Sequence, residues 1–166
     1  MWKSPKEGAA GIQKAKVLKW KAEPTVTRVE NPSSTARART LGYKAKQGIM
    51  VARVRVLKGG RKIPKVKGGR RPARAGCFFT LNKSKQQLAE EKAQTKFRNM
   101  EVLNSYWAGG DGMYEWFEVI MADRTHPSVL ADKNLKWLSS GRGRAFRGLT
   151  SSGRKARGLL NKSRKQ

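Results

Sequence analysis

The stretch 49–57, IMVARVRVL, limits the possible folds most, because its residues alternate as in a β-strand and it is soon followed by two glycines. Successive side chains of a strand point to opposite faces of the sheet. The face that can pack into a core carries Met50, Ala52, Val54 and Val56. The opposite face carries Ile49, Val51, Arg53, Arg55 and Leu57. The pattern therefore predicts a sheet with two arginines on one side.

Two explanations for Arg53 and Arg55 are open from the strand alone. Charged side chains on an edge strand protect it from pairing with other molecules. Alternatively, a rigid strand can present two guanidinium groups to a row of phosphates, whose oxygens bind such groups well. The rest of the sequence has to decide between these explanations.

The charge of the whole chain favours a polyanionic partner. The chain contains 38 Lys and Arg residues against 11 Asp and Glu residues, and its formal net charge is +27. Charge of this density repels itself, so an anionic partner stabilises a compact state. Nucleic acid fits best, because its closely spaced phosphates release counterions when cations neutralise them. An anionic membrane competes, but we expect no membrane association, because no apolar stretch is long enough to span a bilayer or reads as a signal peptide.

We expect no catalytic residue, no metal site and no cofactor. Cys77 is the single cysteine and His126 the single histidine, so neither a disulfide framework nor a zinc site is expected. His126 is expected to cap or pack at a short turn or helix. Glu90 and Glu91 are neighbours on an expected helix, where adjacent side chains project about 100° apart. These two carboxylates therefore do not converge on one substrate atom, and we expect them on a solvated face.

The remaining patterns predict an α+β fold, in which helices pack against a small, largely antiparallel sheet. Helices are expected within 1–23, over 35–41 after a cap at Ser33 or Ser34, and after a cap at Asn82 or Ser84. A short strand is expected over 25–29. The strands 102–107 and 113–121 are joined by AGGDG, which is typical of a β-hairpin.

Both faces of the hairpin are expected to carry aromatic side chains. One face of the first strand is expected to carry Val102, Asn104 and Tyr106. Both faces of the sheet should therefore be covered, one by a helix and the other by a partner or a terminal extension. Tyr106, Trp107 and Trp116 are candidates for stacking on nucleobases, although core packing is the more common role of such residues.

Two long basic segments have too few apolar residues to form a core of their own. The first is 59–76, GGRKIPKVKGGRRPARAG, inside a stretch without acidic residues from 31 to 89. The second is 133–166, which again lacks acidic residues. We expect both to be mobile in the free protein, and we expect removal of 133–166 to leave the melting temperature nearly unchanged. A short helix capped at 150–152 is expected to form once a partner orders it. The predicted organisation is a basic N-terminal extension (1–32), an α+β core with a basic loop (33–132) and an extended RNA-binding tail (133–166).

Several segments resemble one family, the archaeal and eukaryotic large-subunit ribosomal protein fifteen (e-type). These segments are LGYKAKQG at 41–48, RVRV at 53–56 with GGRK at 59–62, VLNSYW at 102–107 with EVI at 118–120, and GRAFRGLTSSGRKARG at 143–158. The resemblance, archaeal in type, implies a small α+β domain buried in large-subunit rRNA, with neighbouring ribosomal proteins as further partners. It also implies no catalysis, a cytoplasmic location in the ribosome and no homo-oligomer.

The predicted RNA-binding residues come from the strand region, the basic loop and the tail. They are Lys44, Lys46, Arg53, Arg55, Lys58, Arg61, Lys62, Lys65, Lys67, Arg70, Arg71, Arg74, Arg142, Arg144, Arg147, Arg154, Lys155 and Arg157. In the tail, Phe146 and Leu149 are expected to fill gaps between RNA helices. A histone-like, DNA-compacting protein is the alternative function, and an RNA-modifying enzyme is a third that no catalytic pattern supports.

Overall fold

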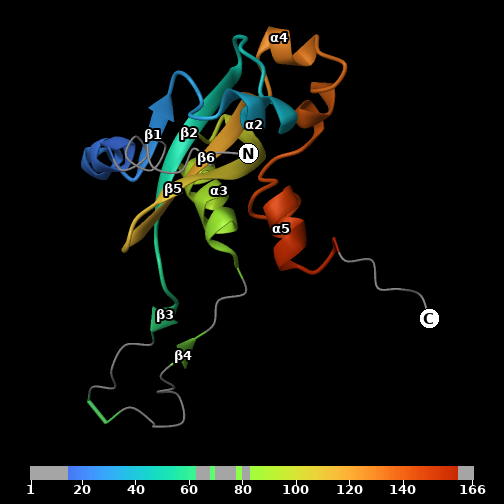
Figure 1. The fold of residues 1–166 in the computed structure, drawn as a ribbon. Coiled ribbons are helices and arrows are strands. Elements are labelled where there is room, and N and C mark those ends of the chain that lie inside the picture. Colours follow the sequence, from blue (N-terminus) through green and yellow to red (C-terminus); the bar gives the residue numbers. More distant parts are fainter. Residues whose placement is uncertain (1–14, 63–67, 70–77, 80–82, 161–166) are drawn as a thin grey trace, which may run out of the picture.

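The computed structural model describes residues 15–62, 68–69, 78–79 and 83–160. Its centre is an antiparallel sheet of four strands in the order β1-β2-β6-β5 (Figure 1). The strands are β1 (Val26–Val29), β2 (Ile49–Leu57), β5 (Met100–Gly110) and β6 (Tyr114–Asp123). Helices pack on both faces, so the predicted α+β class is confirmed.

The predicted strand over 49–57 is confirmed as β2, but it does not lie at an edge of the sheet. It pairs with β1 on one side and with β6 on the other. Charge on an edge strand therefore does not explain the two arginines of β2. β1 and β5 are the edge strands of this sheet.

The predicted hairpin is also confirmed, with a tighter turn than expected. Gly109 and Gly110 belong to β5, so the turn is formed by residues 111–113. The Asp111 carboxylate accepts hydrogen bonds from the backbone N–H of Met113 and of Tyr114, at 2.8 Å and 2.6 Å. Lys21 also pairs with this carboxylate at 2.7 Å, and these contacts lower the pKa of Asp111 to about 2.

The predicted faces of β5 are wrong because the strand contains bulges. Its register with β6 shifts between Val102 and Asn104, and again between Trp107 and Gly109. An extra residue in one strand moves the following side chains to the other face. Val102 therefore packs in the main core, whereas Tyr106 packs on the opposite face.

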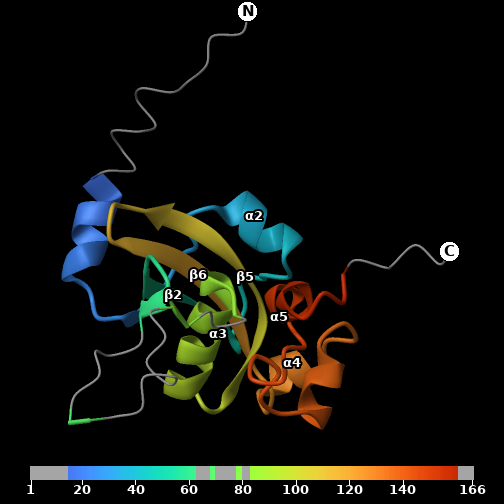
Figure 2. The same cartoon turned by 90° about the horizontal axis from the view of Figure 1, so that it is seen from below.

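Helix α3 (Lys85–Lys96) covers one face of the sheet. It begins at the predicted cap, where the Ser84 hydroxyl accepts from the backbone N–H of Gln87 at 3.1 Å. The small side chains of Ala89 and Ala93 are fully buried against the sheet and let the helix approach closely. Figure 2 shows the sheet between α3 and helix α2 (Thr35–Thr40).

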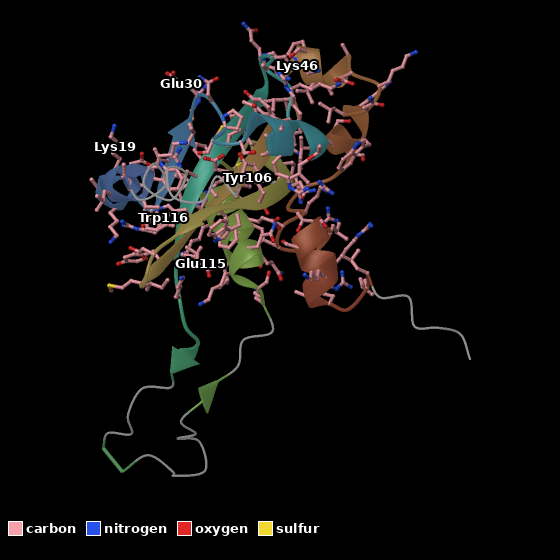
Figure 3. The ribbon with its side chains drawn as sticks, in the orientation of Figure 1. Lys19, Glu30, Lys46, Tyr106, Glu115 and Trp116 are labelled. Atoms are coloured by element: carbon pink, nitrogen blue, oxygen red, sulfur yellow. The ribbon has the colours of Figure 1, made fainter. Side chains whose placement is uncertain are left out.

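The other face is covered by a helix over residues 15–22 and by α2. Trp20 of the N-terminal helix packs against Trp116, with ring centroids 6.1 Å apart. Ala38 of α2 packs against Tyr106 and Ile120. Of the two predicted covers, a partner or a terminal extension, the N-terminal helix provides the second, and α2 covers the rest of this face. Tyr106 and Trp116 (Figure 3) are buried side chains of the core, while Trp107 is 54% exposed.

The C-terminal segment departs most from the prediction, because residues 135–156 fold onto the core instead of extending away. They form the 3₁₀ helix η2 (Lys136–Ser140) and helix α5 (Ser151–Ala156), which follow α4 (Pro127–Leu130). Leu138 is 1% exposed, and Ala145 is part of the main core. The predicted cap of α5 is confirmed at Thr150.

Strand β3 (Arg61–Lys62) lies near the start of the basic loop, and strand β4 (Phe78–Phe79) follows its end. The two strands pair in a small antiparallel sheet, which Figure 1 shows away from the main sheet. The predicted loop residues 63–67 and 70–76 lie outside the described residues. In the part of the chain that is described, no helix is long and apolar enough to cross a membrane.

We predict that ending the chain after residue 132 lowers its stability, contrary to the expectation from the sequence. The truncation removes buried Leu135, Leu138 and Ala145, so the loss should be about 3 kcal/mol or more, which corresponds to roughly 10 °C in melting temperature. Thermal unfolding of the purified chain measures this change. A chain that ends after residue 160 retains these side chains and is the control. An unchanged melting temperature of the shorter chain would show that the C-terminal segment does not stabilise the core.

Candidate nucleic-acid interface

Three buried glutamates hold distant segments of the chain to the sheet. Glu90 and Glu118 are fully buried, and Glu101 is 2% exposed. A buried carboxylate is costly unless hydrogen bonds or cations surround it. Each of these glutamates therefore collects donors, and its contacts show which groups are used within the protein.

Glu118 on β6 collects donors from three other elements. Its carboxylate accepts from the backbone N–H and the hydroxyl of Ser33, at 2.9 Å and 2.5 Å, and from the hydroxyl of Tyr106. Arg53 donates to the same carboxylate at 3.4 Å. Burial and the bond to Glu118 raise the pKa of Tyr106 well above its ordinary value. The phenol therefore stays protonated and remains a donor.

Arg53 is held entirely within the protein. Its Nη1 donates to both carboxylate oxygens of Glu23 at 3.0 Å, and its guanidinium lies 4.3 Å from the centre of the Trp20 ring. Its side chain is only 10% exposed. Arg53 thus joins the N-terminal helix to the sheet. Its guanidinium, which was predicted to contact phosphates, instead contacts Glu23, Glu118 and Trp20.

Arg55 is also directed toward the N-terminal part of the chain. Its Nη1 donates to the backbone carbonyl of Lys21 at 2.7 Å. The guanidinium lies 5.0 Å from the centre of the Tyr114 ring. It is half-buried, so part of this group remains accessible.

Glu90 on α3 joins the helix to β5 and to the C-terminal segment. Its carboxylate accepts from the hydroxyls of Ser105 and Thr150, both at 2.5 Å, and of Ser152 at 2.7 Å. Burial raises the pKa of Glu90, although the three hydroxyls act in the opposite direction. The prediction of a solvated Glu90 is therefore wrong. The deciding partners lie some 60 residues away in the sequence, where no local pattern of α3 can reveal them.

Glu101 fixes the first part of the C-terminal segment. Its two oxygens accept from the backbone N–H of Gly143 at 2.8 Å and of Arg144 at 3.2 Å. The Arg144 side chain donates to the carbonyl of Val102 at 2.7 Å and lies 4.4 Å from the centre of the Trp137 ring. Arg144 is thus partly committed to internal contacts.

Asp132 brings two predicted RNA-binding lysines together. Lys44 and Lys46 lie 2.6 Å and 2.8 Å from one oxygen of its carboxylate. These two lysines hold the pKa of Asp132 far below its ordinary value. Lys46 also donates to the backbone carbonyl of Ser128, and Figure 3 shows Lys46 beside α4.

His126 caps α4, as predicted. Its ring accepts from the backbone N–H of Ser128 at 3.2 Å.

Five exposed cations lie on α5, at its end and in the segment that precedes it, and we call them together the C-terminal basic surface. They are Arg142, Arg147, Arg154, Lys155 and Arg157. No carboxylate of the described residues lies within ion-pairing distance of them. Lys58 is also exposed.

The remaining predicted cations belong to the basic loop. Arg61 and Lys62 lie in β3, whereas Lys65, Lys67, Arg70, Arg71 and Arg74 lie outside the described residues. The structure adds Arg98, which is exposed beyond the end of α3 and lines the same pocket as Arg142. The sequence did not point to Arg98 as an RNA-binding residue, because it is a single basic residue outside the long basic segments. Over the described ranges no group of three His, Cys, Asp or Glu side chains is arranged to hold a metal ion.

Comparison with known proteins supports the family resemblance seen in the sequence. A family model described as Ribosomal L15 (Ribosomal_L15e) matches residues 1–166. The chain belongs to this family. It is 52% identical over 151 residues to the large ribosomal subunit protein eL15 of Picrophilus torridus, and the match covers 89% of this chain and 77% of that protein. The predicted archaeal-type family is confirmed.

We predict that Glu90→Ala destabilises the protein far more than Glu91→Ala. The first change leaves three buried hydroxyls without their acceptor and should cost about 2–4 kcal/mol. The second removes a contact to the exposed Lys83 at 2.9 Å and a hydrogen bond from Gln87 at 3.3 Å, and should cost about 1 kcal/mol. Both changes occur on α3, so helix propensity is matched. Urea unfolding measures both values, and equal losses would show that the buried network adds no stability.

We also predict that Glu90 makes the free energy of unfolding depend on pH. A carboxyl whose pKa is higher in the folded than in the unfolded protein binds its proton more tightly when folded, so its contribution to stability falls as the pH rises. Glu90→Gln removes this titration. The free energy of unfolding of the original protein minus that of the variant should therefore decrease as the pH rises from 4.5, the ordinary pKa. Urea unfolding of both proteins across this range measures the difference, and an increase with pH would contradict the raised pKa.

Proposed function

We propose that this protein is a structural constituent of the large ribosomal subunit that binds folded rRNA, with the C-terminal basic surface as its principal contact. The proposal rests on one observation, which is that the acidic groups are used inside the fold whereas the cations around α5 are exposed. The buried carboxylates hold Arg53 and the backbone of the C-terminal segment, while the cations around α5 have no acidic partner among the described residues. Such unpaired cations can neutralise phosphates and release counterions.

The fold holds this surface in one place. Thr150 caps α5 and also donates to Glu90, so the helix is tied to the core at its first turn. Gly153 approaches Gly148 so closely that an added Cβ would lie 2.6 Å from the Cα of Gly148. The cations of α5 are therefore presented from a fixed backbone, which lowers the entropy lost when RNA binds.

Lys44 and Lys46 form a second proposed contact. Each ammonium group has three donors, and Asp132 accepts only one from each. The remaining donors of Lys44, whose side chain is 47% exposed, can bind a phosphate. Asp132 would then hold the two lysines at a fixed separation and reduce their mutual repulsion.

The wider setting follows from the family and from the named relative. We propose a cytoplasmic location in the ribosome, with neighbouring ribosomal proteins as further partners and the basic loop over 59–76 as an additional RNA contact. The match over the whole chain gives no support to a DNA-compacting protein. A structural role without catalysis fits the family best.

We predict that Arg154→Gln, Lys155→Gln and Arg157→Gln together weaken binding to large-subunit rRNA and reduce the slope of log affinity against log salt by about 2 to 3. Stability should change little because these side chains are exposed. The matched control replaces Arg28, Arg37 and Arg39 with Gln, which removes the same charge from β1 and α2. Filter binding at several salt concentrations and incorporation into large subunits are the measurements. Equal losses of RNA affinity in both triple variants would show that net charge, and not this surface, determines binding. Normal incorporation of the α5 variant would refute this surface as the principal contact.

A further inference from the structure

An open hollow of about 310 Å³ lies next to the C-terminal basic surface. Its wall is formed by Gln94 and Thr95 in the last turn of α3, by Arg98 and Glu101 after that helix, and by residues from 142–146. Pockets for small ligands measure about 300–1,000 Å³. The hollow is therefore large enough for one small group and too small for a helix of RNA or protein.

The wall of the hollow has a net positive charge. Arg98 and Arg142 line it from two different segments, and both side chains are exposed. Glu101 is the one acidic residue of the wall, but its oxygens already accept from the backbone N–H groups of Gly143 and Arg144. Two guanidinium groups and a carboxylate that is already hydrogen-bonded favour a phosphate over a basic ligand.

An exposed aromatic ring completes the wall. Phe146 lines the hollow and is 54% exposed, although a phenyl ring gains by being covered. Gln94 closes the inner side of the wall, because it is only 5% exposed and its Nε2 donates to the carbonyl of Met100. A ligand that brings a flat ring would cover the exposed phenyl ring.

We propose that this hollow binds a single unpaired nucleotide of the RNA. The base stacks on Phe146, and the phosphate lies between Arg98 and Arg142. This inference rests on the proposed function, because it assumes that RNA covers this side of the molecule. Unpaired bases commonly stack on aromatic side chains in this way. The hollow would add recognition of RNA shape to the general attraction of the basic surface.

The test compares large subunits that contain either the original protein or Phe146→Leu. Acylation of the 2′-hydroxyl groups of the rRNA reports nucleotides that become mobile. We expect one unpaired nucleotide to become several-fold more reactive in Phe146→Leu, and the same nucleotide to respond to Arg142→Gln. Trp107→Leu is the matched control, because Trp107 is also 54% exposed but lies on β5 outside the hollow. It should leave this nucleotide unchanged.

A second measurement does not depend on the assembly of the variants. Original large subunits whose rRNA contains 5-iodouridine are irradiated, and the cross-link to Phe146 is identified by mass spectrometry. A cross-link to one unpaired nucleotide supports the inference. Contact of Phe146 with a neighbouring protein, or the absence of any nucleotide that responds to Phe146→Leu, would overturn it while the proposed function stands. Failure of the original protein to enter large subunits would instead refute the proposed function.

Discussion

Burial of glutamate inside a strongly cationic chain is the constraint on which the rest of this structure depends. The chain has 11 acidic residues against 38 basic ones, yet three of the acids are buried. Each is surrounded by hydroxyls, backbone N–H groups or a guanidinium, which offsets the cost of removing its charge from water. Glu118 joins the N-terminal segments to the sheet, and Glu90 and Glu101 join the C-terminal segment to it.

Glu118, together with the half-buried Glu23, also holds one cation inside the protein. Arg53 is committed to Glu23 and Glu118 and stacks on Trp20, so it supports the fold. The cations around α5 meet no acid among the described residues and are left to face a polyanion. A cationic protein of this kind thus uses its few carboxylates to stabilise tertiary contacts that self-repulsion would otherwise weaken.

Folding and recognition are consequently coupled in the C-terminal segment. Thr150 serves the cap of α5 and the network of Glu90 at the same time. The backbone next to Gly143 is held by Glu101, and the same stretch contributes Arg142 and Phe146 to the hollow beyond α3. The groups proposed to contact RNA are therefore placed by the same hydrogen bonds that complete the core.

The sequence by itself determined the class of the fold, the strand over 49–57, the hairpin, the caps at Ser84 and Thr150, and the family. These features depend on local periodicity, on turn residues or on contiguous segments that resemble the family, and each can be recognised from neighbouring residues in the sequence. Only the tertiary structure decided that Glu90 is buried, that Arg53 is internal and that residues 135–156 pack on the core. The partners of these residues include groups that lie 30 to 65 positions away in the sequence. A local pattern gives the face on which a side chain lies, but it does not identify what covers that face.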